Sequence, residues 1–200
     1  MIFATFFTFG GHYVRHAEEW AASCQALGLR HAALGLPACS WKNAVMQTGE
    51  ACRAVVGAYA GEVVAFTDAD ARLVRRPDLL LGLETAPGYD VAVHYLDPGG
   101  RFADPPGSRE CLNGTVVIWP TPAATRLVGV WCARNLTRRE HRCADQLNLD
   151  AAIRETGARV YELPPEYCWI PDMSETRYGI REPVIVHGQA SRENAAKGGG

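Results

Sequence analysis

Residues 63–70 read Val63-Val64-Ala65-Phe66-Thr67-Asp68-Ala69-Asp70, an apolar run that stops at two carboxylates. Valine, phenylalanine and threonine favour a β-strand. Because successive strand residues alternate between faces, the i, i+2 spacing puts Asp68 and Asp70 on the same side. Ligands of open α/β sheets bind beyond the carboxyl ends of the strands. Paired carboxylates at such an edge suit a divalent cation and, through it, a phosphate-bearing molecule.

The two aspartates also have a simpler explanation. An Asp-x-Asp pair after a strand can cap a helix or turn, and short acidic pairs are common by chance. The residues that follow favour the metal site, because segment 72–77 contains no capping-box pattern. We therefore expect Asp68 and Asp70 to hold a metal, with a structural cap as the alternative.

Strand-like and helix-like segments alternate along the rest of the chain. β-branched and aromatic runs predict strands at residues 2–9, 30–36, 62–66, 91–95, 115–119, 159–163 and 183–186. Apolar residues at helical spacing predict helices at residues 13–27, 40–59, 79–83, 121–131 and 145–156. This order predicts an α/β protein, an α/β/α sandwich with a mixed, mainly parallel central sheet.

Composition is consistent with a single domain. The chain has 200 residues, of which 48% are hydrophobic, enough for a sizeable core. We expect residues 1–190 to form this domain and residues 191–200 to be a flexible polar tail. The proline- and glycine-rich segment 97–109 predicts a functional loop, which we expect to be mobile without ligand and to close over a bound one.

Charge and cysteine content exclude several classes of protein. A net charge of −2 gives no reason to expect binding to nucleic acid or anionic membranes. No apolar stretch approaches the roughly 20 residues of a transmembrane segment. The seven cysteines are scattered and include no Cys-x-x-Cys pair. They are therefore expected to be free thiols of a cytoplasmic protein rather than zinc ligands.

Five segments contain short motifs whose order along the chain is informative. They read Phe66-Thr67-Asp68-Ala69-Asp70, Cys111-Leu112-Asn113-Gly114-Thr115, Trp131 followed by Asp145-Gln146-Leu147-Asn148, Val160-Tyr161-Glu162-Leu163-Pro164, and Val184-Ile185-Val186-His187-Gly188. In this order they resemble the motifs of nucleotide-diphospho-sugar transferases with the GT-A fold, the Asp-x-Asp glycosyltransferases. The resemblance covers about residues 1–190 and implies a GT-A-like, Rossmann-type sandwich.

The resemblance implies that the chain transfers one sugar, as a hexosyltransferase does. The donor would be a nucleoside diphosphate sugar, UDP-sugar first among them. The acceptor would be a glycan, a lipid, a protein or a small molecule. A divalent cation would neutralise the charge that develops on the leaving diphosphate.

Three residues would hold this cation. By the resemblance, Asp70 ligates the metal directly, Asp68 reaches the donor ribose, the metal or both, and His187 is the third protein ligand. Imidazole beside carboxylates favours Mn²⁺ over Mg²⁺. Taken alone, a histidine after a strand is more often a surface or hydrogen-bonded residue than a metal ligand.

Asp145 and Gln146 are the catalytic candidates that the resemblance implies, because this pair points toward the sugar in related enzymes. Asp145 could equally be a helix N-cap. Asn113 and Gly114 would bind the sugar, since an amide both donates and accepts and glycine allows close approach. Their alternative is a tight turn, for which Asn-Gly is a common signal.

The donor nucleotide would contact residues near the first strand. Thr8 would bond the base or ribose, and Tyr13 would stack on the base, although core packing also explains a tyrosine there. Lys42 or Arg109 would hold the diphosphate, against the alternative of a solvated surface lysine. The chain departs from the glycogenin-type enzymes because no lysine closely follows His187. Phosphate clamping by the C-terminus and the stereochemistry of transfer therefore stay open.

Three other functions fit parts of the sequence. An Asp-x-Asp phosphatase needs threonine or valine where Arg72 stands and usually has its motif on the first strand. A sugar-nucleotide pyrophosphorylase needs a basic glycine-rich loop, and Phe9-Gly10-Gly11-His12 is small and uncharged. A non-catalytic nucleotide-sugar or carbohydrate-binding protein with the same fold is the third.

Overall fold

The computed structural model describes residues 1–86, 88–99, 108–137, 144–179 and 181–190. The predicted tail at residues 191–200 and most of the predicted loop at residues 97–109 lie outside the described residues. The single domain expected for residues 1–190 stays a prediction.

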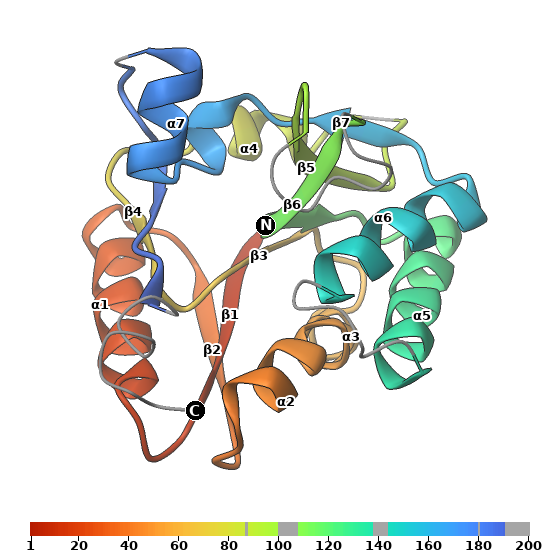
Figure 1. Cartoon of the computed structure of the whole chain (residues 1–200), viewed down its shortest axis with the longest axis horizontal. Helices are drawn as coiled ribbons and strands as arrows, with labels where there is room; N and C mark the ends of the chain where they lie inside the picture. Colours follow the sequence, from red (N-terminus) through yellow and green to blue (C-terminus); the bar gives the residue numbers. More distant parts are fainter. Residues whose placement is uncertain (87, 100–107, 138–143, 180, 191–200) are drawn as a thin grey trace.

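A six-stranded sheet forms the centre of the molecule (Figure 1). Its strands, in spatial order, are β2 (His31–Leu36), β1 (Ile2–Thr8), β3 (Val64–Thr67), β6 (Glu110–Ile118), β5 (Val91–Leu96) and β7 (Val160–Glu162). β1 runs parallel to β2 and β3, and β5 runs parallel to β7. β6 is antiparallel to both of its neighbours. The mixed, mainly parallel sheet that the sequence predicts is confirmed.

Helices pack on both faces of this sheet. One face is covered by α3 (Thr48–Ala58), α5 (Pro122–Thr137) and α6 (Ala144–Thr156), and the other by α1 (Tyr13–Ala26) and α4 (Asp78–Leu83). Strand β3 serves both layers, because Val64 and Phe66 join the first core whereas Ala65 joins the second. Trp131 of α5 and Trp20 of α1 are fully buried in the respective cores. This arrangement is the predicted α/β/α sandwich.

A small second sheet lies beside the main one. It pairs β4 (Ala71–Leu73) with β8 (Ile185–His187) in antiparallel fashion, and Ala71 is opposite His187. A short 3₁₀ turn (Pro165–Tyr167) and α7 (Pro171–Tyr178) lead from β7 to β8. The pairing matters for the site, because Ala71, the residue after Asp70, lies beside His187, the predicted metal ligand. These two residues are 116 positions apart in the chain.

The structure corrects three expectations about elements. Residues 40–59 form two helices, α2 (Trp41–Met46) and α3, which meet at Gln47. The strand predicted at residues 115–119 begins earlier, at Glu110, so Asn113 and Gly114 lie inside β6 and not in a turn. Local turn preference gives way here to hydrogen bonding with β3 and β5 on either side. The strand predicted at residues 183–186 belongs to the small sheet.

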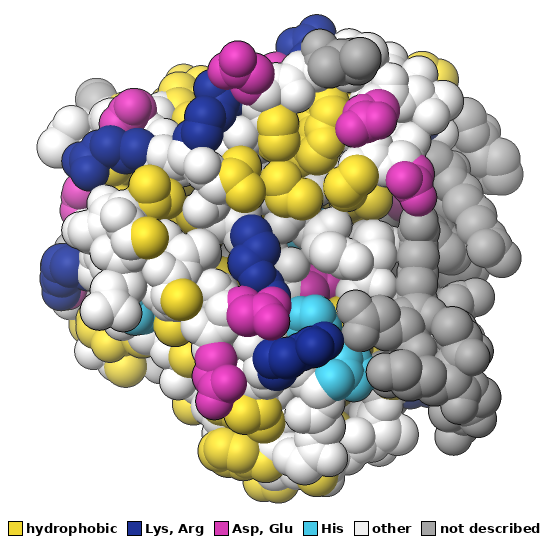
Figure 2. Space-filling view, turned by 90° about the vertical axis from the view of Figure 1, so that its left-hand side faces the viewer, with side chains coloured by type: hydrophobic (Ala, Val, Ile, Leu, Met, Phe, Trp, Pro, Cys, Tyr) yellow, Lys and Arg dark blue, Asp and Glu magenta, His cyan; other side chains and the backbone are white. Residues whose placement is uncertain are grey.

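Charges on the α1 side of the molecule are intermixed. Figure 2 shows lysine and arginine side chains beside acidic ones on this face. Arg72 pairs with Glu19 of α1, and Arg75 pairs with Glu182. Among the described residues, basic side chains on this face are thus interspersed with acidic ones and do not form a continuous basic patch.

Candidate metal centre and cavity

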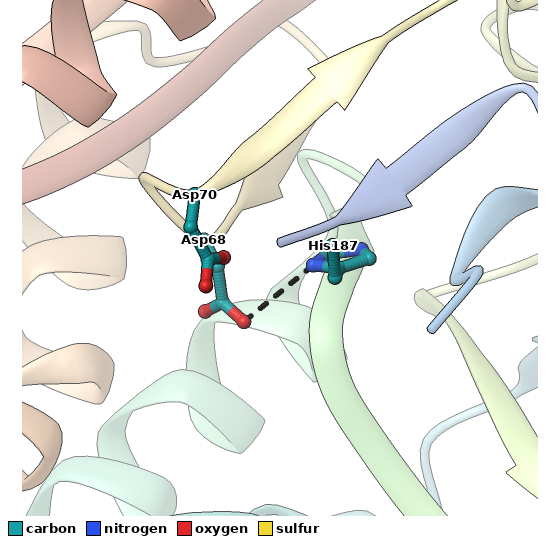
Figure 3. A group of neighbouring side chains, drawn as sticks. All are labelled: Asp68, Asp70 and His187. Atoms are coloured by element: carbon teal, nitrogen blue, oxygen red, sulfur yellow. Dashed lines mark ion pairs between the residues drawn. The ribbon is translucent and has the colours of Figure 1, made fainter. Parts of the chain in front are cut away.

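Asp68, Asp70 and His187 lie together at the carboxyl end of β3 (Figure 3). One ligand atom from each of the three lies within 4.8 Å of the others. The His187 Nδ1 atom is 3.6 Å from Asp68 Oδ2. The two aspartates come from the turn between β3 and β4, and the histidine is the last residue of β8. The grouping is thus the one expected from the sequence.

Backbone hydrogen bonds fix the turn that carries the aspartates. The Ala71 amide donates to the Asp68 carbonyl at 3.1 Å, and the Gly188 amide donates to the Asp70 carbonyl at 3.1 Å. The Ala190 amide donates to the Asp70 Oδ2 atom at 2.7 Å. One carboxylate oxygen of Asp70 is therefore anchored by the chain that follows β8, and this anchoring orients the other oxygen, Oδ1.

The chemistry around these atoms fits a cation. Asp70 Oδ1 and His187 Nδ1 are buried and have no hydrogen-bond partner, a state that costs free energy unless another group satisfies them. Gly114 keeps the space open, because a Cβ there would lie 2.9 Å from His187 Cε1 and 3.3 Å from Asp68 Oδ2. Two carboxylates and an imidazole are a donor set that Mn²⁺ and similar divalent ions accept.

The three groups influence one another's protonation. Burial, followed by the charge of Asp70, raises the pKa of Asp68, while His187 opposes the rise. Burial would lower the pKa of His187, but Cys168 and Asp68 together hold it well above its ordinary value. The Asp68 side chain is nevertheless 45% exposed, because it faces open space. Without a cation, protons therefore offset part of the negative charge of the two aspartates, and a divalent ion would replace these protons.

The open space is a cavity of about 240 Å³. Nine residues that the sequence singles out line it: Thr8, Tyr13, Asp68, Asp70, Asn113, Gly114, Asp145, Gln146 and His187. Lys42 is the exception, since it is exposed on α2 and its neighbours Trp41 and Val45 face the cavity instead. Successive helical residues point in different directions, so Lys42 is turned outward. Arg109 pairs with Glu162 and is also absent from the lining. The positions of Lys42 and Arg109 do not support the diphosphate role expected of them.

Known structures with the same fold are glycosyltransferases. A glycosyltransferase involved in glycosylation of the major capsid of PBCV-1 superposes with a TM-score of 0.71 over 98% of both chains, at 10% identity. The galactosyltransferase LgtC, whose structure contains donor and acceptor sugar analogues, gives 0.58 at 14% identity, over 94% of this chain and 86% of that one. This chain has the GT-A fold.

The GT-A fold accounts for the whole of the described chain but not for the whole of every similar protein. GlyE of Streptococcus pneumoniae TIGR4 superposes with a TM-score of 0.63 at 12% identity, over 93% of this chain and 54% of its own. This chain thus spans about half of GlyE. No protein-family model and no curated protein matches the sequence. None of the helices within the described ranges has the length and apolar character that crossing a membrane requires.

A second polar network lies opposite the metal ligands in the GT-A cavity. The Asn113 amide donates to Asp145 Oδ2 at 2.5 Å, and the Gln146 amide donates to Glu110 Oε1 at 2.6 Å. Trp131 Nε1 donates to the Asp145 carbonyl at 2.9 Å. Asp145 is the second residue of α6 and not its N-cap, and a carboxylate in this first turn is favourable. Burial raises the pKa of Asp145 to about 7.

Several residues of the site carry no recognisable sequence signal. Thr115 contacts His187 Nε2 at 3.2 Å, and Glu110 holds Gln146. Arg72 donates to the Ala71 carbonyl at 2.7 Å and also bonds Glu19, so it ties the metal turn to α1. Trp41, Phe7, Cys168, Ile170 and Gln189 complete the wall of the cavity. Their positions depend on long-range pairing, which a single sequence does not reveal.

Proposed function

We propose that this protein is a metal-dependent glycosyltransferase that moves one sugar from a nucleoside diphosphate sugar to an acceptor. One observation carries the proposal. Asp70 Oδ1 and His187 Nδ1 are both buried without a hydrogen-bond partner, and their residues group with Asp68 in the cavity that Asp145 and Asn113 also line. A cation site beside hydrogen-bonding groups that can orient a sugar, on a GT-A fold, supports glycosyl transfer, because the cation can stabilise the leaving diphosphate.

Different residues of the cavity would bind the cation, the nucleoside and the sugar. Asp68, Asp70 and His187 would hold a divalent cation, which supplies charge neutralisation to the departing diphosphate. Thr8 and Tyr13 would bind the nucleoside, the hydroxyl by hydrogen bonding and the ring by stacking. The apolar wall around Trp41 and Phe7 would restrict water, which competes with the acceptor.

The opposite network would orient the sugar. Asn113 holds Asp145 at 2.5 Å, so the Asp145 carboxyl has a fixed direction in the cavity. We propose that Asp145 and Gln146 contact the sugar near its reacting carbon, and that Asn113 and Gly114 bind its hydroxyls. Fixed hydrogen-bonding groups of this kind lower the barrier because they need no reorganisation during the reaction.

The finer features of the proposal rest on chemistry. We propose UDP-sugar as the donor and Mn²⁺ before Mg²⁺ as the cation, because the ligand set includes an imidazole. The LgtC structure, which contains donor and acceptor sugar analogues, supports a hexosyl donor by likeness of fold alone. We also propose a cytoplasmic location, because the six cysteines within the described residues are all free thiols.

Release of UDP from a panel of UDP-sugars, in which water takes the sugar in place of the unidentified acceptor, tests the proposal when it is measured with Mn²⁺ and with EDTA. We expect release from one donor only with Mn²⁺, and a fall of at least about 100-fold in Asp70→Asn, because the cation stabilises the leaving group. Asp78→Asn is the matched control, since Asp78 is 79% exposed and pairs with Arg76. Equal release in EDTA, or by Asp70→Asn, would contradict the proposal. Nucleotide binding without release from any donor would instead indicate a binding protein.

A further inference from the structure

The two ring nitrogens of His187 have different surroundings. Nδ1 faces Asp68 Oδ2 at 3.6 Å and has no hydrogen-bond partner. Nε2 lies 3.2 Å from the hydroxyl oxygen of Thr115. His187 is 2% exposed and Thr115 is 0% exposed, so water does not compete for either contact. The orientation of the ring is therefore decided by protein groups.

The contact with Thr115 bears on metal binding through the position of one proton. To ligate a cation the imidazole must lose one proton, and the neutral ring then has a proton on one nitrogen only, so just the other nitrogen can ligate. A threonine hydroxyl can accept a hydrogen bond from Nε2–H or donate one to bare Nε2. When it accepts, the lone pair of Nδ1 points toward the two aspartates. When it donates, Nδ1 carries the proton and cannot bind the metal.

Thr115 occupies a rigid position. It lies in β6 opposite Thr67 of β3, the residue immediately before Asp68. The Asp68 amide donates to the carbonyl of the neighbouring Gly114 at 3.0 Å. The strand that carries the hydroxyl is thus hydrogen-bonded to the segment that carries the aspartates. Groups of this kind, which bond the outer nitrogen of a ligating histidine, typically change metal affinity 10- to 100-fold when removed.

We propose that Thr115 is a positioning residue that keeps the proton of His187 on Nε2, so that Nδ1 is the nitrogen that binds the cation. The inference rests on the proposed metal site and adds to it a specific ligand atom and the residue that selects it. Gly114 and Thr115 then act as neighbours with separate tasks. Glycine leaves room for the ring, and threonine orients its proton.

Titration calorimetry of Mn²⁺ into Thr115→Val and Thr115→Ser tests the inference. Valine keeps the shape of threonine but has no hydroxyl, whereas serine keeps the hydroxyl. We expect a dissociation constant raised about 10- to 100-fold in Thr115→Val and close to wild type in Thr115→Ser. Unfolding midpoints measured in EDTA show that both variants are folded. Wild-type affinity in Thr115→Val would overturn the inference while leaving the metal site intact.

Nitrogen-15 spectra of the histidine rings give an independent measurement. The diamagnetic ion Cd²⁺ is added to labelled wild-type protein, and the His187 signals are assigned by their loss in His187→Gln. We expect the proton on Nε2 and coordination through Nδ1. Coordination through Nε2 would overturn the inference. Failure of the wild-type protein to bind either Mn²⁺ or Cd²⁺ would overturn both the inference and the proposed function.

Discussion

Gly114 is the residue whose smallness the metal site needs most. In Gly114→Ala the new methyl group would lie 2.9 Å from His187 Cε1 and 3.0 Å from its Nδ1, so the ring must move. We expect Mn²⁺ affinity to fall at least about 10-fold, as when the support of a ligating histidine is lost. The measurement is calorimetric titration of Mn²⁺.

Gly129→Ala is the control for this change. Gly129 lies within α5, and a Cβ there would meet nothing within 4 Å. Alanine in a helix interior is expected to stabilise the protein by about 0.5–1 kcal/mol and to leave Mn²⁺ affinity unchanged. Equal affinity in Gly114→Ala and Gly129→Ala would show that the space beside His187 is not the metal site.

Asp145 gives the stability of the metal-free protein a pH dependence. Burial raises its pKa to about 7, above the ordinary value of about 3.9 for an unfolded chain. Between these two values the folded state holds a proton that the unfolded state releases, so stability falls as the pH rises from about 4 to 7. Asp145→Asn removes this dependence. We measure the free energy of unfolding by urea in EDTA. Its difference, Asp145→Asn minus wild type, should therefore be roughly 1–3 kcal/mol larger at pH 8 than at pH 4. Parallel stability curves for the two proteins would contradict the assigned burial.

Individual residues of the candidate site could be predicted only where their neighbours in the sequence indicate their chemical role. Asp68 and Asp70 follow a clear strand, and resemblance to glycosyltransferase motifs added His187, Asp145 and their neighbours. Thr115 and Glu110 could not be predicted, because their roles depend on which side chain lies opposite them in the folded sheet. The diphosphate role of Lys42 stays a prediction, because sequence gives no direction for a residue at the start of a short helix and Lys42 is exposed on α2.

At the scale of elements, prediction succeeded where the pattern was long. The helix predicted at residues 13–27 is observed as Tyr13–Ala26, since apolar spacing over four turns is unambiguous. Strands β4 and β8 have three residues each and form only by pairing with one another. Local pattern gave no strand at β4, and the strand predicted at residues 183–186 overlaps β8 without indicating its partner. The local pattern also did not predict the division of residues 40–59 into α2 and α3, because a single residue, Gln47, separates the two helical segments.

Asp90 joins three elements at the end of the sheet away from the cavity. Its carboxylate accepts from Thr121 Oγ1 at 2.7 Å, from the Arg159 amide at 2.9 Å and from Arg159 Nε at 3.0 Å. It thereby connects the start of β5, the residue before α5 and the residue before β7. We expect Asp90→Ala to lower the free energy of unfolding at pH 7 by about 2 kcal/mol, the loss of a hydrogen-bonded charge. Urea unfolding measures the change.

The effect should also depend on pH. Hydrogen bonding with Arg159 holds the pKa of Asp90 well below its ordinary value. A depressed carboxyl pKa stabilises the folded state above the unfolded pKa, and the contribution is lost as the pH falls toward the folded one. Wild type and Asp90→Ala should therefore converge below about pH 4. Asp78→Ala, at a 79% exposed position, should change stability by less than about 0.5 kcal/mol. A difference of the same size at pH 7 and at pH 3 would contradict the assigned ion pair.

At the scale of the whole molecule, the cavity depends on elements distant in sequence. The turn between β3 and β4 supplies Asp68 and Asp70, β8 supplies the histidine, β6 the asparagine and glycine, and α6 a third aspartate, Asp145. The class of fold could be predicted from the order of strands and helices. The expected ligand site followed from the rule that ligands bind beyond the carboxyl ends of the strands. The second sheet, which closes the site by pairing Ala71 with His187, could be seen only in the structure.

Thermal unfolding with UDP, GDP, ADP or CDP, each with Mn²⁺ and with EDTA, tests most directly whether the cavity is a metal–nucleotide site. A ligand that binds only the folded protein raises the unfolding midpoint by mass action. One nucleotide, expected to be UDP, should raise the midpoint in Mn²⁺ but not in EDTA, and Asp70→Asn should abolish the rise. The same midpoint with every nucleotide in Mn²⁺ and in EDTA would contradict the assignment of this cavity to a nucleotide-sugar donor.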